Sequence, residues 1–329
     1  MMKKIAIIGA GITGITLAHK LQKTCEVIIF DKSRGVGGRM ATRRADPYQF
    51  DHGAQFFSAH SDEFKEFLKP LISQKIVTPW QATFAEVDHN GIIEQRQWHN
   101  DSPHFVANPG MNALAKFLSK DLHISLNSQI SHLEYDQKWC LITVNNEKFT
   151  GFDWVIVTAP AEQAARILPT DFEHSNAIKK IKMQACFSLM LGFDEPLTLP
   201  FDAARIHNAD ISWLSVNSSK PYRGTPYSLL IHSTNQWAEQ HIDNNNDDMQ
   251  THLHQETSRI LKLPLDHAKH KAIHAWRYAN IGKQTSPAFY LDQPRQLIAC
   301  GDWCIQGRVE AAFTSATLAA DKLLALLKK

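Results

Sequence analysis

The chain has 329 residues, which is long enough to bury two sizeable hydrophobic cores. Its formal net charge is only +2, and its 35 basic residues are dispersed along the chain, which argues against a nucleic-acid partner. The 17 histidines show no spacing typical of a metal site, so we expect no metal. No apolar run reaches the length of a membrane span, and the five cysteines stand mostly in apolar runs. We therefore expect a cytoplasmic protein with reduced thiols and no secretory leader, although Cys300 and Cys304 leave a redox pair as an alternative.

The first predicted element is a buried strand that leads through a glycine-rich turn into a helix. Residues 5–8 are Ile-Ala-Ile-Ile, and glycines follow at Gly9, Gly11 and Gly14. The first glycine permits a tight turn, the second lets the backbone approach a pyrophosphate, and the third lets the helix pack closely on the strand. The amides at the start of that helix can then face a phosphate. This pattern predicts a dinucleotide-binding fold.

A second apolar strand at 27–30 ends at Asp31, where a carboxylate can hydrogen-bond a ribose. The loop that follows, residues 32–39, places the basic Lys32 and Arg34 among glycines, which suits a phosphate and a ribityl chain. A plain nicotinamide domain usually continues into a helix at this point. The loop therefore favours FAD, with a flexible surface loop as the alternative.

The middle of the chain predicts further elements by spacing and turn residues. We expect a helix over 64–76 interrupted near Pro70, an antiparallel pair at 81–87 and 91–98, a helix at 112–118, strands at 124–130, 131–135 and 139–144, a buried parallel strand at 154–160 that returns to the nucleotide sheet, and a polar loop at 244–248. Near the C-terminus, residues 297–302 predict a short buried strand that ends in Gly-Asp, followed by an alanine-rich helix. An ordinary amphipathic helix would satisfy the same pattern.

These motifs resemble the FAD enzymes of the flavin amine oxidase superfamily, whose second motif ends in Gly-Gly-Arg as residues 37–39 do. The family usually has Glu where this chain has Asp31, and residues 301–303 differ from versions with paired glycines. In the family, an acid at the position of Asp302 binds the ribityl chain, and the next helix points its N-terminus at the flavin ring. The resemblance implies non-covalent FAD contacts from Gly9, Gly11, Ile12, Thr13, Gly14, Asp31, Lys32, Arg34, Gly38, Arg39, Met40, Gly53, Ala54, Gln55, Phe56, Ile130, Asp302, Val309, Glu310 and Ala311.

Segments between the outer motifs are similar to bacterial renalase-type proteins of the same superfamily. They lie at 50–57, 109–112, 213–221, 231–233 and 275–278. The resemblance implies a substrate pocket that includes His232, Trp276 and Tyr278, with Trp213 and Asn217 as weaker candidates. Each has a plainer interpretation, because His232 stands in an apolar run and aromatics on one face of a strand are often core residues.

The expected fold is α/β: a Rossmann-like FAD-binding domain of the glutathione-reductase/hydroxybenzoate-hydroxylase kind, with an inserted α+β substrate domain on a mixed antiparallel sheet. The expected ranges are 1–60, 101–165 and 286–329 for the first domain and 61–100 and 166–285 for the second. The resemblance implies an oxidase that converts isomeric dihydro-NAD(P) to NAD(P)+ by hydride transfer to flavin N5, with O2 reduced to H2O2. An amine oxidase and a non-catalytic FAD-binding redox sensor remain alternatives. No obligate protein partner is evident.

Overall fold

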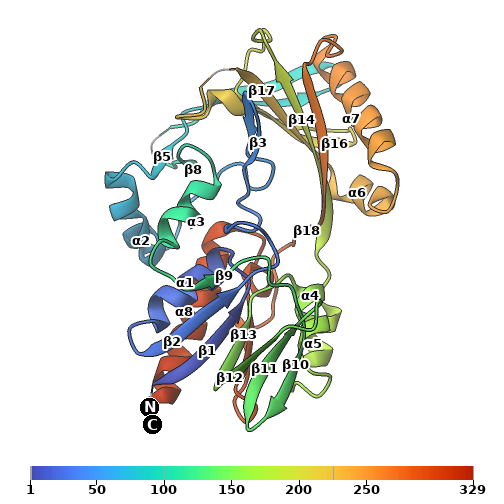
Figure 1. Ribbon diagram of the computed structural model, residues 1–329. Helices are drawn as coiled ribbons and strands as arrows, with labels where there is room; N and C mark the ends of the chain where they lie inside the picture. Colours follow the sequence, from blue (N-terminus) through green and yellow to red (C-terminus); the bar gives the residue numbers. More distant parts are fainter. Residues whose placement is uncertain (1, 100, 225, 329) are drawn as a thin grey trace. The chain divides into compact units, whose positions relative to one another are not determined.

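A computed structural model describes residues 2–99, 101–224 and 226–328 (Figure 1). The chain divides into two compact units. Unit 1 comprises 1–38, 115–183 and 280–329, and unit 2 comprises 39–114 and 184–279. Residues 1, 100 and 329, at which predicted domain ranges begin or end, lie outside the described residues. Residues 39–60 and 101–114, expected in the FAD-binding domain, belong to unit 2 by their contacts. Residues 166–183 and 280–285, expected in the substrate domain, belong to unit 1, and the functional assignment of the domains stays a prediction.

Unit 1 is built on a six-stranded sheet with the order β19-β20-β13-β1-β2-β9. Its strands are β1 (Lys3–Ile8), β2 (Cys25–Phe30), β9 (Ile124–Ser125), β13 (Trp154–Val157), β19 (Phe289–Asp292) and β20 (Leu297–Cys300). All neighbours pair in parallel except β19, which is antiparallel to β20. The predicted return of the chain at 154–160 and the buried late strand are confirmed, since β13 lies between β1 and β20.

Two helices pack together in unit 1, α1 (Ile12–Leu21) and α8 (Val309–Leu327). The core they share with the sheet includes isoleucines of β1 and small residues of α8 such as Ala316 and Ala320. Small side chains let the helices approach the sheet closely, and apolar strands buried on both faces are typical of parallel sheets. The predicted Rossmann-like domain is therefore confirmed.

A smaller sheet in unit 1 consists of β10 (Ile130–Asp136), β11 (Lys138–Thr143) and β12 (Lys148–Phe152), and the unit also holds α4 (Ala161–Ile167) and α5 (Ser175–Lys180). The strand expected over 124–130 is interrupted after β9. Asn127 adopts a left-handed φ of 55°, and the Ser128 amide donates to the carbonyl of Asp31 at 2.8 Å. This turn ends β9 and lets a new strand begin at Ile130.

Unit 2 contains a seven-stranded mixed sheet with the order β18-β14-β17-β16-β15-β6-β7. The strands are β6 (Thr83–Asp88), β7 (Gly91–Gln97), β14 (Gln184–Phe193), β15 (Ala203–Ile206), β16 (Ile211–Val216), β17 (Tyr227–Ser233) and β18 (His270–Asn280). One face is covered by α6 (Asn235–His241) and α7 (Asn246–Leu261). Apolar residues at alternate positions, such as Leu189, Leu214 and Ile231, form the core on that face. Their neighbours in sequence point to the opposite face of the sheet. This face carries aromatic rings, including those of Trp213, His232 and Trp276, and is called the aromatic face.

The remaining elements of unit 2 are β3 (Arg43–Ala45), β4 (Tyr48–Phe50), α2 (Asp62–Ser73), β5 (Val77–Pro79) and β8 (Phe105–Ala107), and α3 (Asn112–Leu118) spans the boundary between the units. The prediction of an interruption near Pro70 is wrong, because α2 continues to Ser73. Pro70 stands in the last turn, where it removes a single backbone hydrogen bond.

The polar loop expected at 244–248 is also wrong in part. Helix α7 begins at Asn246, and the side chain of Asn245 accepts a hydrogen bond from the amide of Asp247 at 2.9 Å. Asp247 and Asp248 lie in the first turn, where the helix dipole favours negative charge. The polar run at 244–248, which predicts a loop from the sequence, therefore contains the capped start of α7.

All five cysteines are free, and burial raises the pKa of the Cys300 and Cys304 thiols, which argues against a redox pair. Within the described part of the chain, none of the helices combines the length and apolar character needed to cross a membrane.

Candidate cofactor site and candidate substrate face

The glycine turn of unit 1 has the geometry of a phosphate cradle. Gly9 has a φ of +116°, which side-chain-bearing residues rarely adopt, and a Cβ on Gly14 would collide with the carbonyl oxygen of Gly9. A Cβ on Gly11 would meet no atom within 4 Å, so this glycine borders open space. Gly11 is the N-cap residue of α1, which has no side-chain cap and no acid in its first turn. Its N-terminus is therefore suited to an anionic ligand.

Asp31 ties the two glycine-rich loops of unit 1 together. One carboxylate oxygen accepts from the amide of Ala10 at 2.6 Å, and the other accepts from the amide of Ser33 at 2.7 Å. Gly38 lies against Gly11, since a Cβ on Gly38 would be 3.5 Å from the Gly11 Cα. The structure thus brings the predicted loops together. The ribose contact of Asp31 stays a prediction, and so do the contacts of exposed Lys32 and Arg34 and of Ile130, which is buried at the start of β10.

The C-terminal motif lies beside the same helix start. The hydroxyl of Thr13 donates to the carbonyl of Ala312 at 3.3 Å, so the first turns of α1 and α8 adjoin. Helix α8 begins at Val309, with Glu310 and Ala311 in its first turn and no side-chain cap at Arg308. Asp302 is buried in a short 3-10 helix, where its backbone carbonyl accepts from the amides of Ile305 and Gln306. Two uncapped helix starts and a glycine cradle in one unit fit the phosphates and polar ring edge of FAD.

The other predicted cofactor residues belong to unit 2. A Cβ on Gly53 would collide with the carbonyl oxygen of Arg39, which also accepts from the amide of Ala54 at 2.9 Å. The main chain at Arg39 and the buried Met40 therefore runs directly against the segment that begins at Gly53. The side chain of Gln55 is fully used within the protein: its amide donates to two backbone carbonyls and its oxygen accepts from Ser215 and Lys220. The FAD contacts of these residues and of Phe56 stay predictions.

A buried ionic cluster in unit 2 has no counterpart among the sequence predictions. Asp51, Lys220 and Arg223 are almost fully buried, and Asp51 accepts from Arg223 at 2.7 Å and lies 3.5 Å from the Lys220 ammonium. The Thr42 hydroxyl and the Met111 amide complete its hydrogen bonds. Although burial alone would raise it, the two cations and the Met111 amide hold the pKa of Asp51 below its usual value. Burial lowers the pKa of Lys220 to about 8.

Asn217 lies within this cluster rather than on an open surface. Its side chain is fully buried, accepts from the Asp51 amide and the Lys220 ammonium at 3.2 Å each, and donates to the Gln49 carbonyl at 3.0 Å. Through these contacts Asn217 holds the backbone of Asp51 and the Lys220 ammonium in position. One signal in the sequence could have revealed the cluster: Asn217, Lys220 and Arg223 follow one another closely among turn residues. The sequence does not show, however, that these side chains contact Asp51.

The aromatic face of unit 2 gathers most of the predicted substrate residues. Trp213 on β16 is paired directly with His232 on β17, so both side chains leave the same face. Trp276 on β18 stacks on His52 with ring centroids 5.3 Å apart, and its indole donates to the His52 carbonyl at 2.7 Å. His274 makes edge contacts with both rings. Half-buried Tyr278 continues the same alternation along β18.

The histidines of this face are uncharged at neutral pH. Burial lowers the pKa of His52, His232 and His274 to about 4 in each case. Nearby ionisable groups lower these pKa values further: mainly His274 for His52, Lys220 for His232 and Arg43 for His274. No group of His, Cys, Asp and Glu in the described residues could hold a metal ion. The face therefore offers neutral rings and neutral hydrogen-bonding groups.

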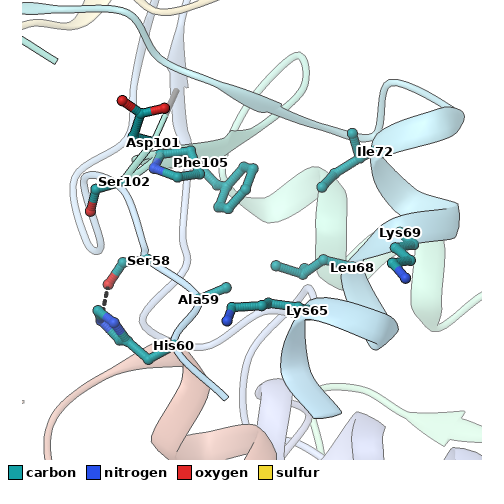
Figure 2. Close-up of a pocket in the computed structure, with 11 residues that line it drawn as sticks. Ser58, Ala59, His60, Lys65, Leu68, Lys69, Ile72, Asp101, Ser102 and Phe105 are labelled. Carbon is teal, nitrogen blue, oxygen red and sulfur yellow. Dashed lines mark hydrogen bonds between the residues drawn. The ribbon is translucent and has the colours of Figure 1, made fainter. Parts of the chain in front are cut away.

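A separate hollow of about 490 Å³ lies beside α2 (Figure 2). It is lined by α2 residues, including Lys65 and Leu68, and by residues 58–60, 101–103 and 105. The Ser58 hydroxyl and His60 imidazole are hydrogen-bonded at 2.9 Å on its wall. It shares no lining residue with the predicted substrate pocket. Its lysines, Lys65 and Lys69, form ion pairs with acidic residues of the same helix.

Comparison with known proteins identifies the class. The sequence model of the flavin containing amine oxidoreductases matches residues 74–324, and that of the NAD(P)-binding Rossmann-like domain matches residues 7–71. The chain belongs to the flavin containing amine oxidoreductase family. This membership implies FAD as the cofactor and an oxidoreductase as the class of enzyme, which confirms both predictions, and the glycine cradle of unit 1 fits that cofactor.

Individual relatives are more distant. The chain is 31% identical over 101 residues to prenylcysteine oxidase 1-like of Mus musculus, and 35% identical over 82 residues to coproporphyrinogen III oxidase of Staphylococcus aureus. These matches cover 29% and 24% of this chain, and the chain spans only about a fifth of each relative's length, 20% and 18%.

Solved structures share the fold over the whole chain. A putative protoporphyrinogen oxidase from Exiguobacterium sp. 255-15 matches with a TM-score of 0.78 at 12% identity, covering 98% of this chain and 99% of that one. Reduced UDP-galactopyranose mutase matches with a TM-score of 0.76 at 13% identity, covering 100% and 95%. At these identities the likeness concerns the fold alone.

Proposed function

We propose that the chain is an FAD-dependent oxidase of the renalase type, which converts isomeric dihydro-NAD(P) to NAD(P)+ while oxygen is reduced to hydrogen peroxide. The observation that carries the proposal is the neutral, ring-lined face of unit 2. His52, His232 and His274 are uncharged at neutral pH and stand among tryptophans. When bound, FAD accepts a hydride and returns the electrons to oxygen.

A dihydronicotinamide needs no strong base from the protein. The lone pair of its ring nitrogen drives the hydride out, so the side chains need only bind the ring, orient it and exclude water. Trp213 and Trp276 supply flat apolar surfaces for a planar ring. A neutral histidine such as His232 contributes a hydrogen bond without a charge, which suits an uncharged ring.

Amine oxidation is the competing activity, and the family's description favours it. Aromatic side chains can also form a cage around a neutral amine. The two activities differ in the reductant that they accept, so the distinction is experimental.

The deciding experiment is anaerobic stopped-flow absorbance of the purified flavoprotein, mixed separately with isomeric dihydronicotinamide dinucleotides, ordinary NADH and a panel of amines. We expect rapid bleaching of the flavin by the isomers alone. Bleaching by an amine instead would contradict the proposal in favour of an amine oxidase, and the absence of bleaching by any reductant would leave the non-catalytic flavoprotein.

A further inference from the structure

Several side chains of the aromatic face carry ring nitrogen atoms that are buried and have no partner in the described residues. They include Nε1 of Trp213, Nε2 of His232 and Nδ1 of His52. Native proteins pair the great majority of their buried polar atoms, so each exception needs an explanation. Two of these atoms, Nε1 of Trp213 and Nε2 of His232, belong to residues directly opposite each other on β16 and β17, at positions whose Cβ atoms lie about 5 Å apart in such pairs.

One of the two nitrogens is a donor and the other is an acceptor. A tryptophan Nε1 can only donate. The ring of His232 lies toward the backbone carbonyl of His52, and because Nε2 has no partner, this carbonyl favours the proton of the neutral ring on Nδ1. In the neutral ring Nε2 is then an acceptor. Burial keeps this ring neutral by lowering its pKa to about 4.

The protein around this pair does not complete it. Phe56, Phe84 and Trp98 surround the Trp213 ring with centroids at 5.6, 6.0 and 6.4 Å, and none of these side chains has an acceptor for Nε1–H. The His52 carbonyl already accepts from the Ser188 hydroxyl and the Trp276 indole at 2.7 Å each. The donor on Trp213 and the acceptor on His232 therefore match a planar group that carries a hydrogen-bond acceptor and a hydrogen-bond donor side by side.

We propose that Trp213 and His232 form a subsite for an unsubstituted carboxamide, whose oxygen accepts from Trp213 Nε1 and whose NH2 group donates to His232 Nε2. The inference rests on the proposed function, because the nicotinamide ring carries such a group. It deepens that proposal by naming the chemical feature that the site selects. A ketone offers only the acceptor and a carboxylate offers only acceptors, so both leave one half of the pair unmatched.

The test is binding, measured by isothermal titration calorimetry on the oxidised holoprotein, so it does not depend on turnover. The probes are NAD+, its 3-acetylpyridine analogue, which keeps the carbonyl but has no NH2 group, and nicotinic acid adenine dinucleotide. We expect NAD+ to bind about tenfold more tightly than either analogue, the ratio for one hydrogen bond lost in a buried site.

Two variants assign the two halves of the pair. His232→Phe removes the acceptor and should weaken NAD+ binding to the level of the acetyl analogue, while binding of that analogue stays unchanged. Trp213→Phe removes the donor and should weaken both ligands by a similar factor. In His232→Phe the carbonyl of His52 still accepts from Ser188 and Trp276, so the variant leaves no unpaired carbonyl. Flavin content and the melting temperature check that each variant is folded.

The inference is overturned if wild-type protein binds the acetyl analogue as tightly as NAD+, if NAD+ does not bind, or if neither variant changes NAD+ affinity, as when only an ordered water occupies the pair. The comparison of ligands in the wild-type protein requires no variant to fold. Failure of the proposed function is a separate result, because it shows itself as a flavin that isomeric dihydronicotinamides do not reduce.

Discussion

Unit 1 builds its candidate site from the backbone, whereas unit 2 builds its candidate site from side chains on a sheet. In unit 1 the chemistry rests on glycine positions and helix starts that are close in sequence, such as Gly9, Gly11 and Gly14. In unit 2 it rests on His52, Trp213 and Trp276, which come from separate strands and loops. A backbone site tolerates many sequences outside its glycines, while a side-chain site depends on each partner. Variants can test this difference.

The largest expected effect is the loss of FAD from an otherwise folded protein in Gly11→Val. No protein atom lies within 4 Å of a Cβ at Gly11, so the substitution should leave the fold intact and fill only the space for the cofactor. Flavin absorbance per protein and circular dichroism check this. Gly14→Ala is the matched contrast, because its Cβ meets the Gly9 carbonyl oxygen and should destabilise unit 1 itself. A Gly11→Val protein that retains stoichiometric FAD would contradict the placement of the phosphates.

The next largest effect concerns the buried ions of unit 2. Asp51→Ala leaves Lys220 and Arg223 as buried cations without their anion, which should lower the free energy of unfolding by about 3–5 kcal/mol. Asp321→Ala in unit 1 is the control, since Asp321 and its partner Lys20 are both partly exposed and the loss should be below about 1 kcal/mol. Urea unfolding measures both. Equal losses would mean that the ionic cluster is no more important than a surface pair.

The same contrast explains what the sequence predicts well and what it does not. The strands β1, β2, β13 and β20 and the glycine turn follow from local patterns, because strand, turn and helix propensities act over a few residues. The ion cluster of Asp51 depends on contacts across more than 160 residues, and no local pattern specifies them.

The role of Asn217 shows the same limit. A family resemblance places it near a pocket, but its burial among charged groups is set by tertiary packing. The errors at Pro70 and at 244–248 have a different origin: a proline in a last turn and an acidic helix start both resemble a break in local sequence. Local rules thus describe unit 1 more completely than unit 2.

A smaller, pH-dependent effect belongs to unit 2 through its neutral histidines. The pKa of His52 is about 4 in the folded protein and about 6.5 when unfolded, so the unfolded chain binds more protons between these values. Stability should therefore fall as the pH drops from about 6.5 to 4, by up to about 3 kcal/mol from His52 alone. His52→Phe should flatten this part of the profile of unfolding free energy against pH. An identical slope in both proteins would mean that His52 is protonated in the native state.

The smallest effect is expected at Arg277, which lies next to Trp276 on β18 and on the side opposite to the aromatic face. Arg277 is exposed and pairs with Asp243, whereas its neighbour Trp276 points to the aromatic face and bonds His52. Exposed ion pairs contribute little because water screens them, so Arg277→Gln should leave both melting temperature and flavin reduction unchanged. Trp276→Leu, one residue away, should slow reduction by a dihydronicotinamide while FAD stays bound. Because strand geometry sends adjacent side chains to opposite faces, a functional loss in Arg277→Gln would assign the substrate to the other face of the sheet.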